Sequence, residues 1–210
     1  MPNFALEATF KSPVGGVDEV GRGPWAGPVV AAAFVFLDPS SLPLSLSQGI
    51  NDSKKLSALK RNALYHELMA LDGCCYGIGM VSVEEIDSLN ILKATFLAME
   101  RAVNALPERP ATLLIDGKFI PSFPGIQTHP VIGGDGISLS IAAASIVAKV
   151  TRDALMAELA KDYPVYGWES NAGYGTAHHQ QALQTYGITQ HHRKSFAPIR
   201  KLVDLMSLAG

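Results

Sequence analysis

The chain has few of the residues that build a disulfide framework or a cysteine-based metal site. Its 210 residues include two cysteines, Cys74 and Cys75, which are adjacent. Neighbouring cysteines rarely bond to each other, and no pair has the C-x-x-C spacing of a zinc site. We therefore expect two reduced, buried thiols, which suit a reducing, cytoplasmic setting.

Long hydrophobic runs are also missing. The longest apolar run, from Val29 to Leu37, is too short to span a bilayer, and no basic segment leads into an apolar one near Met1. Aromatic residues make up only 8% of the chain, too few to indicate a stacking platform for single-stranded nucleic acid. These absences favour a globular, cytoplasmic protein with no membrane partner.

An excess of positive charge is absent as well. The net charge is −2 and the pI is about 6.3, whereas nucleic-acid binders are often basic overall. The distribution is uneven, because the segment after Gly167 holds four Lys or Arg residues, two acids and four of the six histidines. A modest basic region therefore follows an acidic body, which is compatible with a polyanionic partner.

Apolar runs predict five strands with helices between them. The run Pro28–Leu37 is continuous and predicts a central strand buried on both faces. Strands first, followed by strands alternating with helices, indicate an α/β layered fold. The expected strands are Val14–Val20, Pro28–Leu37, Cys74–Val81, Leu113–Ile115 and Ile126–Ile132.

Five helices are expected, and Pro39–Gln48 is expected to be a loop. The first helix follows Asn51–Lys55, with Ser53 as its possible cap. Its expected apolar face consists of Leu56, Leu59, Ala63, Leu64 and Leu68. The others are a helix from Ser82 or Ser88 to about Leu106, then Leu139–Leu159, Thr176–Tyr186 and Ala197–Leu208. We expect a catalytic domain over residues 1–165 and a helical extension over residues 166–210, packed on the same domain.

Four acids share one local context, because each follows a strand-like run and lies close to glycine. They are Asp18, Glu19, Asp116 and Asp135. Groups at strand ends converge on the crevice where α/β proteins bind ligands. Ligation by oxygen alone favours Mg²⁺ or Mn²⁺, and two such ions can support phosphodiester cleavage. Without cations, mutual repulsion should raise one or more of the pKa values.

Two questions about these acids stay open at this point. An Asp beside Gly is more often a turn residue than a metal ligand. Successive side chains of a strand also point to opposite faces, so Asp18 and Glu19 cannot both face one metal from a regular strand. Either the strand breaks at Glu19, as Gly21 permits, or Glu19 approaches from a different angle.

Several ordered motifs identify a family. From Gly16 to Ile199 the chain resembles bacterial ribonuclease HII, the type 2 ribonuclease H. The motifs are Asp18–Pro24 with Gly27–Val29, Asn51–Leu56, Ile86–Asp87, Asn90–Thr95, Ile115–Gly117, Ser138–Asp153, Gly173–Thr176, Tyr186–Thr189 and His192–Phe196.

The resemblance implies a ribonuclease H-like fold, with a mixed sheet of about five strands flanked by helices and a C-terminal helical extension. It implies an endoribonuclease that cleaves the RNA strand of RNA–DNA hybrids and incises 5′ of single ribonucleotides in duplex DNA. Two Mg²⁺ or Mn²⁺ ions would support hydrolysis that leaves a 3′-OH and a 5′-phosphate. We expect a monomer. A replication clamp is a possible partner, although the C-terminal segment contains no obvious clamp-binding peptide.

The resemblance also assigns roles to residues. Asp18, Glu19, Asp116 and Asp135 match the family's four catalytic, metal-binding acids. Gly21, Arg22 and Gly23 match the segment that contacts the ribose 2′-hydroxyl, and Tyr174 matches the tyrosine that stacks on the following sugar. Backbone groups without a Cβ can approach a 2′-OH, the group that distinguishes RNA from DNA. Lys54 and Lys55 are expected to contact phosphate.

The chain departs from the family pattern at two positions, where glycine and alanine replace a common lysine. Gly133 and Ala172 should weaken affinity for the phosphate backbone more than the chemistry. Asp153 could lean toward the metals or pair with Lys149 four residues before it. The four C-terminal histidines lack a recognised zinc spacing.

Two other functional classes remain as alternatives. A DNA-only nuclease, such as a junction resolvase, would not need the Gly-Arg-Gly turn or Tyr174. A non-catalytic hybrid-binding module would not need four acids. Within the superfamily, ribonuclease HIII would carry an additional N-terminal domain, whereas about a dozen residues precede the first expected strand here.

Overall fold

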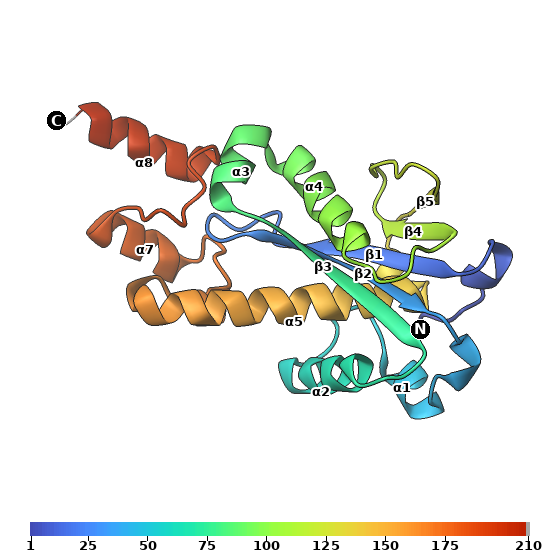
Figure 1. Ribbon diagram of the computed structural model, residues 1–210. Coiled ribbons are helices and arrows are strands. Elements are labelled where there is room, and N and C mark those ends of the chain that lie inside the picture. Colours follow the sequence, from blue (N-terminus) through green and yellow to red (C-terminus); the bar gives the residue numbers. More distant parts are fainter. Residues whose placement is uncertain (209–210) are drawn as a thin grey trace. The chain divides into compact units, whose positions relative to one another are not determined.

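The computed structural model describes residues 1–208 and contains one five-stranded mixed sheet, which can be followed in Figure 1. The strands are β1 (Val14–Val20), β2 (Val29–Phe36), β3 (Cys74–Val81), β4 (Thr112–Asp116) and β5 (Gln127–Val131). Their order in the sheet is β3-β2-β1-β4-β5. β1 pairs antiparallel with β2 and parallel with β4, and β4 pairs parallel with β5. The expected mixed sheet is confirmed.

The chain forms two compact units. The first contains residues 1–20, 30–80 and 96–150, and the second contains residues 21–29, 81–95 and 151–210. The expected division at residues 165 and 166 stays a prediction.

The helices fall close to their expected positions. They are α1 (Leu44–Gly49), α2 (Ala58–Met69), α3 (Val83–Leu89), α4 (Ile91–Asn104), α5 (Leu139–Asp162), α6 (Trp168–Asn171), α7 (Ala177–Tyr186) and α8 (Ala197–Leu208). Four short 3₁₀ turns lie at Glu7–Thr9, Pro39–Ser41, Gly134–Gly136 and Pro164–Tyr166. None of the helices within residues 1–208 is long and apolar enough to cross a membrane.

Three local expectations were wrong. The segment Pro39–Gln48 is not a plain loop, because it holds a 3₁₀ turn and most of α1. The cap of α2 is Ser57, whose hydroxyl accepts a hydrogen bond from the Lys60 amide, and not Ser53. Leu59 and Ala63 do not belong to the buried face of α2, because 84% of the surface of Leu59 is exposed and Ala63 is exposed as well.

The helix expected to end near Leu106 is broken into α3 and α4 at Asn90. Of the two expected starts, Ser82 is the correct one, because a capping box formed by Ser82 and Glu85 starts α3. Asn90 then adopts a φ of 73°, a conformation that asparagine tolerates better than most residues. Its side-chain oxygen accepts hydrogen bonds from the amides of Leu92 and Lys93, so this one residue ends α3 and caps α4.

The core of the first unit forms where β2 packs with α1, α2 and the first half of α5. Every residue of β2 is buried, as expected for a central strand. Small side chains let α5 lie very close to the sheet, since Ala142, Ala143 and Ala144 are fully buried. At the closest point Gly16 of β1 faces the backbone of Ser140 and Ile141.

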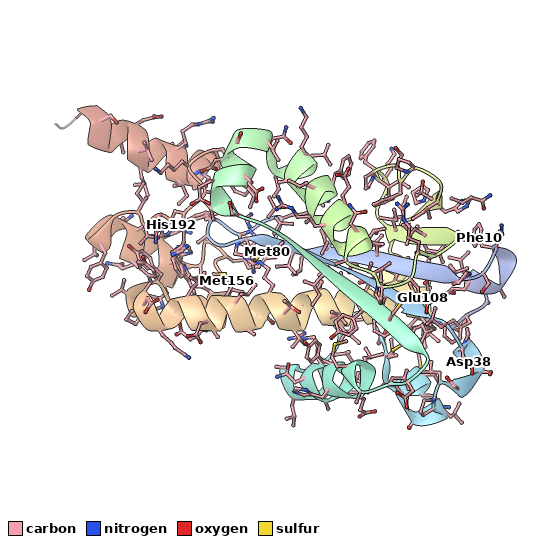
Figure 2. The ribbon with its side chains drawn as sticks, viewed as in Figure 1. Phe10, Asp38, Met80, Glu108, Met156 and His192 are labelled. Atoms are coloured by element: carbon pink, nitrogen blue, oxygen red, sulfur yellow. The ribbon has the colours of Figure 1, made fainter. Side chains whose placement is uncertain are left out.

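The second unit has its own aromatic core. Trp168 is fully buried and lies against Tyr163 and Tyr166, with ring centroids 5.5 and 5.1 Å away. Trp168 is therefore a core residue of this unit. Met156 of α5, labelled in Figure 2, belongs to the same apolar cluster.

We expect Gly16→Ala to destabilise the protein, because a methyl group there would overlap the backbone of Ser140 and Ile141. Overpacking of this kind costs about 1–3 kcal/mol. Gly136→Ala is the matched control, because the space around that position is open and its backbone is not strained. Urea unfolding of both variants measures the effect, and equal stability of the two would contradict the close approach.

Candidate functional site

Two of the expected acids end neighbouring parallel strands. Val17 of β1 pairs with Ile115 of β4, so Asp18 and Asp116 occupy the next equivalent positions on the two strands. Side chains at equivalent positions of adjacent strands point to the same face of a sheet. The register of the sheet therefore brings these two carboxylates together.

A third acid is joined to them by the backbone. The amide of Gly134 donates a hydrogen bond of 2.7 Å to Oδ1 of Asp116, which ties the 3₁₀ turn Gly134–Gly136 to the end of β4. Asp135 lies in this turn and is half-buried. Burial raises the pKa of Asp135, and the negative charges of Asp52 and then Asp116 raise it further, so Asp135 lies within electrostatic reach of Asp116.

Glu19 differs from the other three acids. β1 stays regular through Val20, with Asp18 opposite Ala32 and Glu19 opposite Ala31, so the strand does not break at Glu19. The Glu19 side chain therefore points away from the face that Asp18 occupies. The Glu19 amide donates a hydrogen bond of 2.7 Å to Oδ1 of Asp18. The sequence left two possibilities open, a strand break at Glu19 or an approach of Glu19 to the metals from a different angle than Asp18, and only the second remains.

The site holds more negative charge than its surroundings compensate. Burial raises the pKa of Asp18 well above its ordinary value, and the charges of Glu19 and Asp116 raise it further. The pKa of Asp135 is also raised, first by burial and then by Asp52 and Asp116. Carboxylate oxygens are the ligands that hard divalent cations prefer, and the positive charge of such a cation would favour the ionised form of these acids. Within the described residues, no group of three or more His, Cys, Asp or Glu side chains is already arranged around a common metal position.

One expected phosphate ligand, Lys54, lies among these acids. Its partial burial lowers its pKa, but the negative charges of Asp18, Asp135 and other nearby acids outweigh this and raise it. Lys54 is therefore held in its charged form beside the carboxylates. Lys55 lies farther out, with Nζ 3.5 Å from Oδ2 of Asp52.

A fifth acid, Asp52, was not predicted from the sequence. Its carboxyl group lies close enough to that of Asp135 for the two to share a proton, and its Oδ1 accepts a hydrogen bond from the Lys54 amide at 2.9 Å. The only signal in the sequence was its place in the segment Asn51–Leu56. Next to it, Ser53 bonds Ser145 of α5 (Oγ to Oγ, 2.9 Å), and Ser145 bonds the Asp18 carboxylate. This segment therefore supports the acids from the side of α5.

The second unit contains the Gly-Arg-Gly turn. Gly21 has a φ of +92°, and an added Cβ would meet the side chain of Arg152 and the Pro28 carbonyl, so only glycine fits there. A Cβ placed on Gly23 would lie 3.3 Å from a ring carbon of Tyr174. The turn and Tyr174, a residue that is 48% exposed, are therefore neighbours. Two expected nucleic-acid contacts thus share one surface of this unit.

Two histidines connect this surface to the aromatic core. His192, labelled in Figure 2, and His179 of α7 are fully buried, with their Nε2 atoms 3.0 Å apart. Nδ1 of His179 lies 3.0 Å from the Tyr174 carbonyl, and the Thr189 amide donates a 2.9 Å hydrogen bond to Nδ1 of His192. Burial lowers the pKa of both rings, that of His192 to about 3, so both are neutral at physiological pH.

Sequence reasoning also missed two buried arginines, Arg152 and Arg193, which bind main-chain carbonyls of the segment from Gly21 to Pro28. Both lie in motifs that carry the family resemblance, but nothing in the sequence distinguishes a buried arginine from an exposed one. Asp153 lies beside Arg152 in the chain and its charge raises the pKa of Arg152, against the larger opposing effect of burial. Both alternatives for Asp153, contact with the metals and pairing with Lys149, stay untested.

The raised pKa of Asp18 predicts a stability gain for Asp18→Asn in the absence of metal. A carboxyl group whose pKa is higher in the folded state favours folding at low pH, and this contribution disappears as the pH rises through the folded-state pKa. We therefore expect the variant to have the higher Tm at pH 7–8 in chelator, with the difference shrinking toward pH 4. A gain of about 1 kcal/mol would raise Tm by about 2–4 °C. Thermal unfolding across this pH range tests it, and a lower Tm for the variant at pH 7–8 would contradict it.

Comparisons with known proteins agree on one family. The family model for ribonuclease HII matches residues 15–199. Ribonuclease HII of Paramagnetospirillum magneticum is 57% identical over 95% of this chain and 97% of its own length, and that of Gluconobacter oxydans is 54% identical over 97% of both. The crystal structure of ribonuclease H2 from Pyrococcus horikoshii covers 92% of this chain and 98% of its own, with a TM-score of 0.77 and 25% identity. The chain therefore belongs to the ribonuclease HII family and is an endoribonuclease, a hydrolase of the ribonuclease H type.

Proposed function

We propose that this protein cleaves the RNA strand of RNA–DNA hybrids and incises 5′ of single ribonucleotides embedded in duplex DNA. The observation that carries the proposal is the pairing register of β1 and β4, which places Asp18 beside Asp116 at the strand ends. Both the cleavage and the incision would be hydrolysis that leaves a 3′-OH and a 5′-phosphate.

Asp18, Glu19, Asp116 and Asp135 are the residues that would hold two divalent ions, Mg²⁺ or Mn²⁺. When bound, such ions supply an activated water and stabilise the leaving 3′-oxygen. The support is the raised pKa of Asp18 and Asp135, since a site that disfavours its own negative charge gains most from cations. The regular path of β1 suggests that Glu19 contributes from the other side of the strand.

The remaining residues would bind and orient the substrate. Lys54 is held charged beside the acids, so it can contact a phosphate oxygen, and Lys55 can do so from the exposed surface. Gly21, Arg22 and Gly23 would read the 2′-hydroxyl through their main-chain groups. Tyr174 would stack on the next sugar, and its exposed ring beside Gly23 supports that role.

A DNA-only nuclease is the competing class. It would have no use for a turn that admits only glycine at Gly21 and lies beside an exposed tyrosine, because no 2′-hydroxyl has to be read. We further propose that the protein acts as a cytoplasmic monomer in the repair of ribonucleotides in DNA, with a replication clamp as a possible partner.

The test is a DNA duplex with one ribonucleotide, incubated with Mg²⁺, Mn²⁺ or chelator, with the cut position mapped. We expect metal-dependent incision 5′ of the ribonucleotide and no cutting of an all-DNA control. Equal cutting of the all-DNA duplex would assign the protein to the resolvase class.

Asp116→Asn should abolish cutting while substrate binding survives. We expect a loss of about 10³-fold in kcat/KM, equivalent to about 4 kcal/mol of transition-state stabilisation. Single-turnover cleavage and fluorescence anisotropy with the same duplex measure the two effects. A variant with normal turnover would refute the role of Asp116.

A further inference from the structure

The buried side chain of Arg193 forms hydrogen bonds with the main chain of the Gly-Arg-Gly turn. Arg193 is fully buried, and its guanidinium group donates hydrogen bonds to the carbonyls of Gly21 (Nη2, 2.6 Å) and Arg22 (Nη1, 3.1 Å). Nε and Nη2 also donate to the Gly27 carbonyl at 2.9 and 2.7 Å, and Nη2 donates to Pro28 at 3.2 Å. One side chain therefore binds both ends of the segment from Gly21 to Pro28.

Such a group is costly to bury, which argues that its position is needed. Arginine is almost never fully buried unless it is paired, and here the hydrogen bonds go to main-chain carbonyls. Burial, together with the charge of Arg152, lowers the pKa of Arg193 to about 9, so the group still carries its positive charge at neutral pH. A charged, planar donor with this geometry fixes the direction of each carbonyl that it binds.

The direction of the carbonyls sets the direction of the neighbouring amides. A trans peptide unit is planar, with its C=O and N–H pointing to opposite sides. The Gly21 carbonyl shares its peptide unit with the Arg22 amide, and the Arg22 carbonyl shares its unit with the Gly23 amide. Because Arg193 binds both carbonyls, both N–H groups point away from its guanidinium group.

We propose that Arg193 is a positioning residue for recognition of the ribose, holding the two peptide units so that the N–H groups of Arg22 and Gly23 face the 2′-hydroxyl. This inference rests on the proposed function, and it assigns the discrimination between RNA and DNA to a side chain that does not touch the substrate.

The surroundings of Arg193 keep it in place. Its own amide donates a hydrogen bond of 2.8 Å to the Trp25 carbonyl. The next two amides, of Lys194 and Ser195, donate to the two oxygens of Asp87 at 2.9 Å each. Hydrogen bonds therefore hold the backbone of Arg193 and of the two residues that follow it, which fixes the position from which the Arg193 side chain extends.

Arg152 offers a matched comparison. It is also fully buried, and it donates to the carbonyls of Pro28 (2.9 Å), Ala26 (3.2 Å) and Ala172 (2.9 Å). Its side chain also lies against Gly21, but its hydrogen bonds to this segment go to the carbonyls of Ala26 and Pro28 and not to those of Gly21 or Arg22. Loss of either guanidinium group should cost stability, but only loss of Arg193 should free the two peptide units.

The experiment compares Arg193→Lys with Arg152→Lys, since lysine keeps the charge but cannot bridge two carbonyls in a plane. Affinity is measured by anisotropy in an Asp116→Asn background, for a duplex with one ribonucleotide and for an all-DNA duplex. We expect Arg193→Lys to reduce the preference for the ribonucleotide duplex about tenfold or more, with the affinity for all-DNA unchanged. Arg152→Lys should keep the preference within about twofold. In the otherwise unaltered enzyme, Arg193→Lys should lower kcat/KM on the ribonucleotide duplex by a similar factor.

A preference that survives Arg193→Lys, or that falls equally in both variants, would overturn the inference. If Arg193→Lys does not fold, amide NMR of the Asp116→Asn protein decides instead. The Arg22 and Gly23 amide signals should then shift with the ribonucleotide duplex and not with all-DNA, and equal responses would overturn it. Failure of the proposed function looks different, because the unaltered enzyme would then show no ribonucleotide-dependent cutting.

Discussion

Repulsion between carboxylates at the ends of neighbouring strands is the constraint on which the rest of this site depends. The register of β1 and β4 forces Asp18 and Asp116 together, and the hydrogen bond from Gly134 to Asp116 brings Asp135 with them. The sheet cannot relax this crowding, because Gly16 lies against the backbone of α5 and β2 is buried throughout. The positive charge of Lys54 and the hydrogen-bonded pair of Ser53 and Ser145 offset part of the repulsion between the carboxylates. Bound cations would offset the rest.

The sequence could predict the sheet and its acidic edge because both follow from local patterns. β2 and β4 are runs of apolar residues bounded by proline or an acid, and such runs are recognisable without tertiary information. β3 was predicted with its observed bounds, Cys74–Val81. The convergence of Asp18 and Asp116 followed from a general property of sheets, namely that equivalent ends of parallel strands meet at one edge.

The features that the sequence did not reveal depend on contacts between distant residues. Asp52 belongs to the acidic site only because its segment meets Asp135, some eighty residues later in the chain. Arg193 binds carbonyls more than 160 residues before it, and no local pattern marks it as buried. The break at Asn90 was missed for a different reason, because helical periodicity continues across it and only the backbone conformation shows the interruption.

The paired histidines have a consequence for how Tyr174 is held. The Thr189 amide occupies Nδ1 of His192, so the single hydrogen of that ring sits on Nε2 and points at His179. His179 accepts it on Nε2 and carries its own hydrogen on Nδ1, directed at the Tyr174 carbonyl. The donors on this path thus run in one direction, from Thr189 to Tyr174, and the Trp168 indole N–H also donates to Nε2 of His179 at 3.3 Å. A second hydrogen on either ring would make two N–H groups face each other. The hydrogen bond that holds the Tyr174 carbonyl therefore depends on the tautomers of two buried rings.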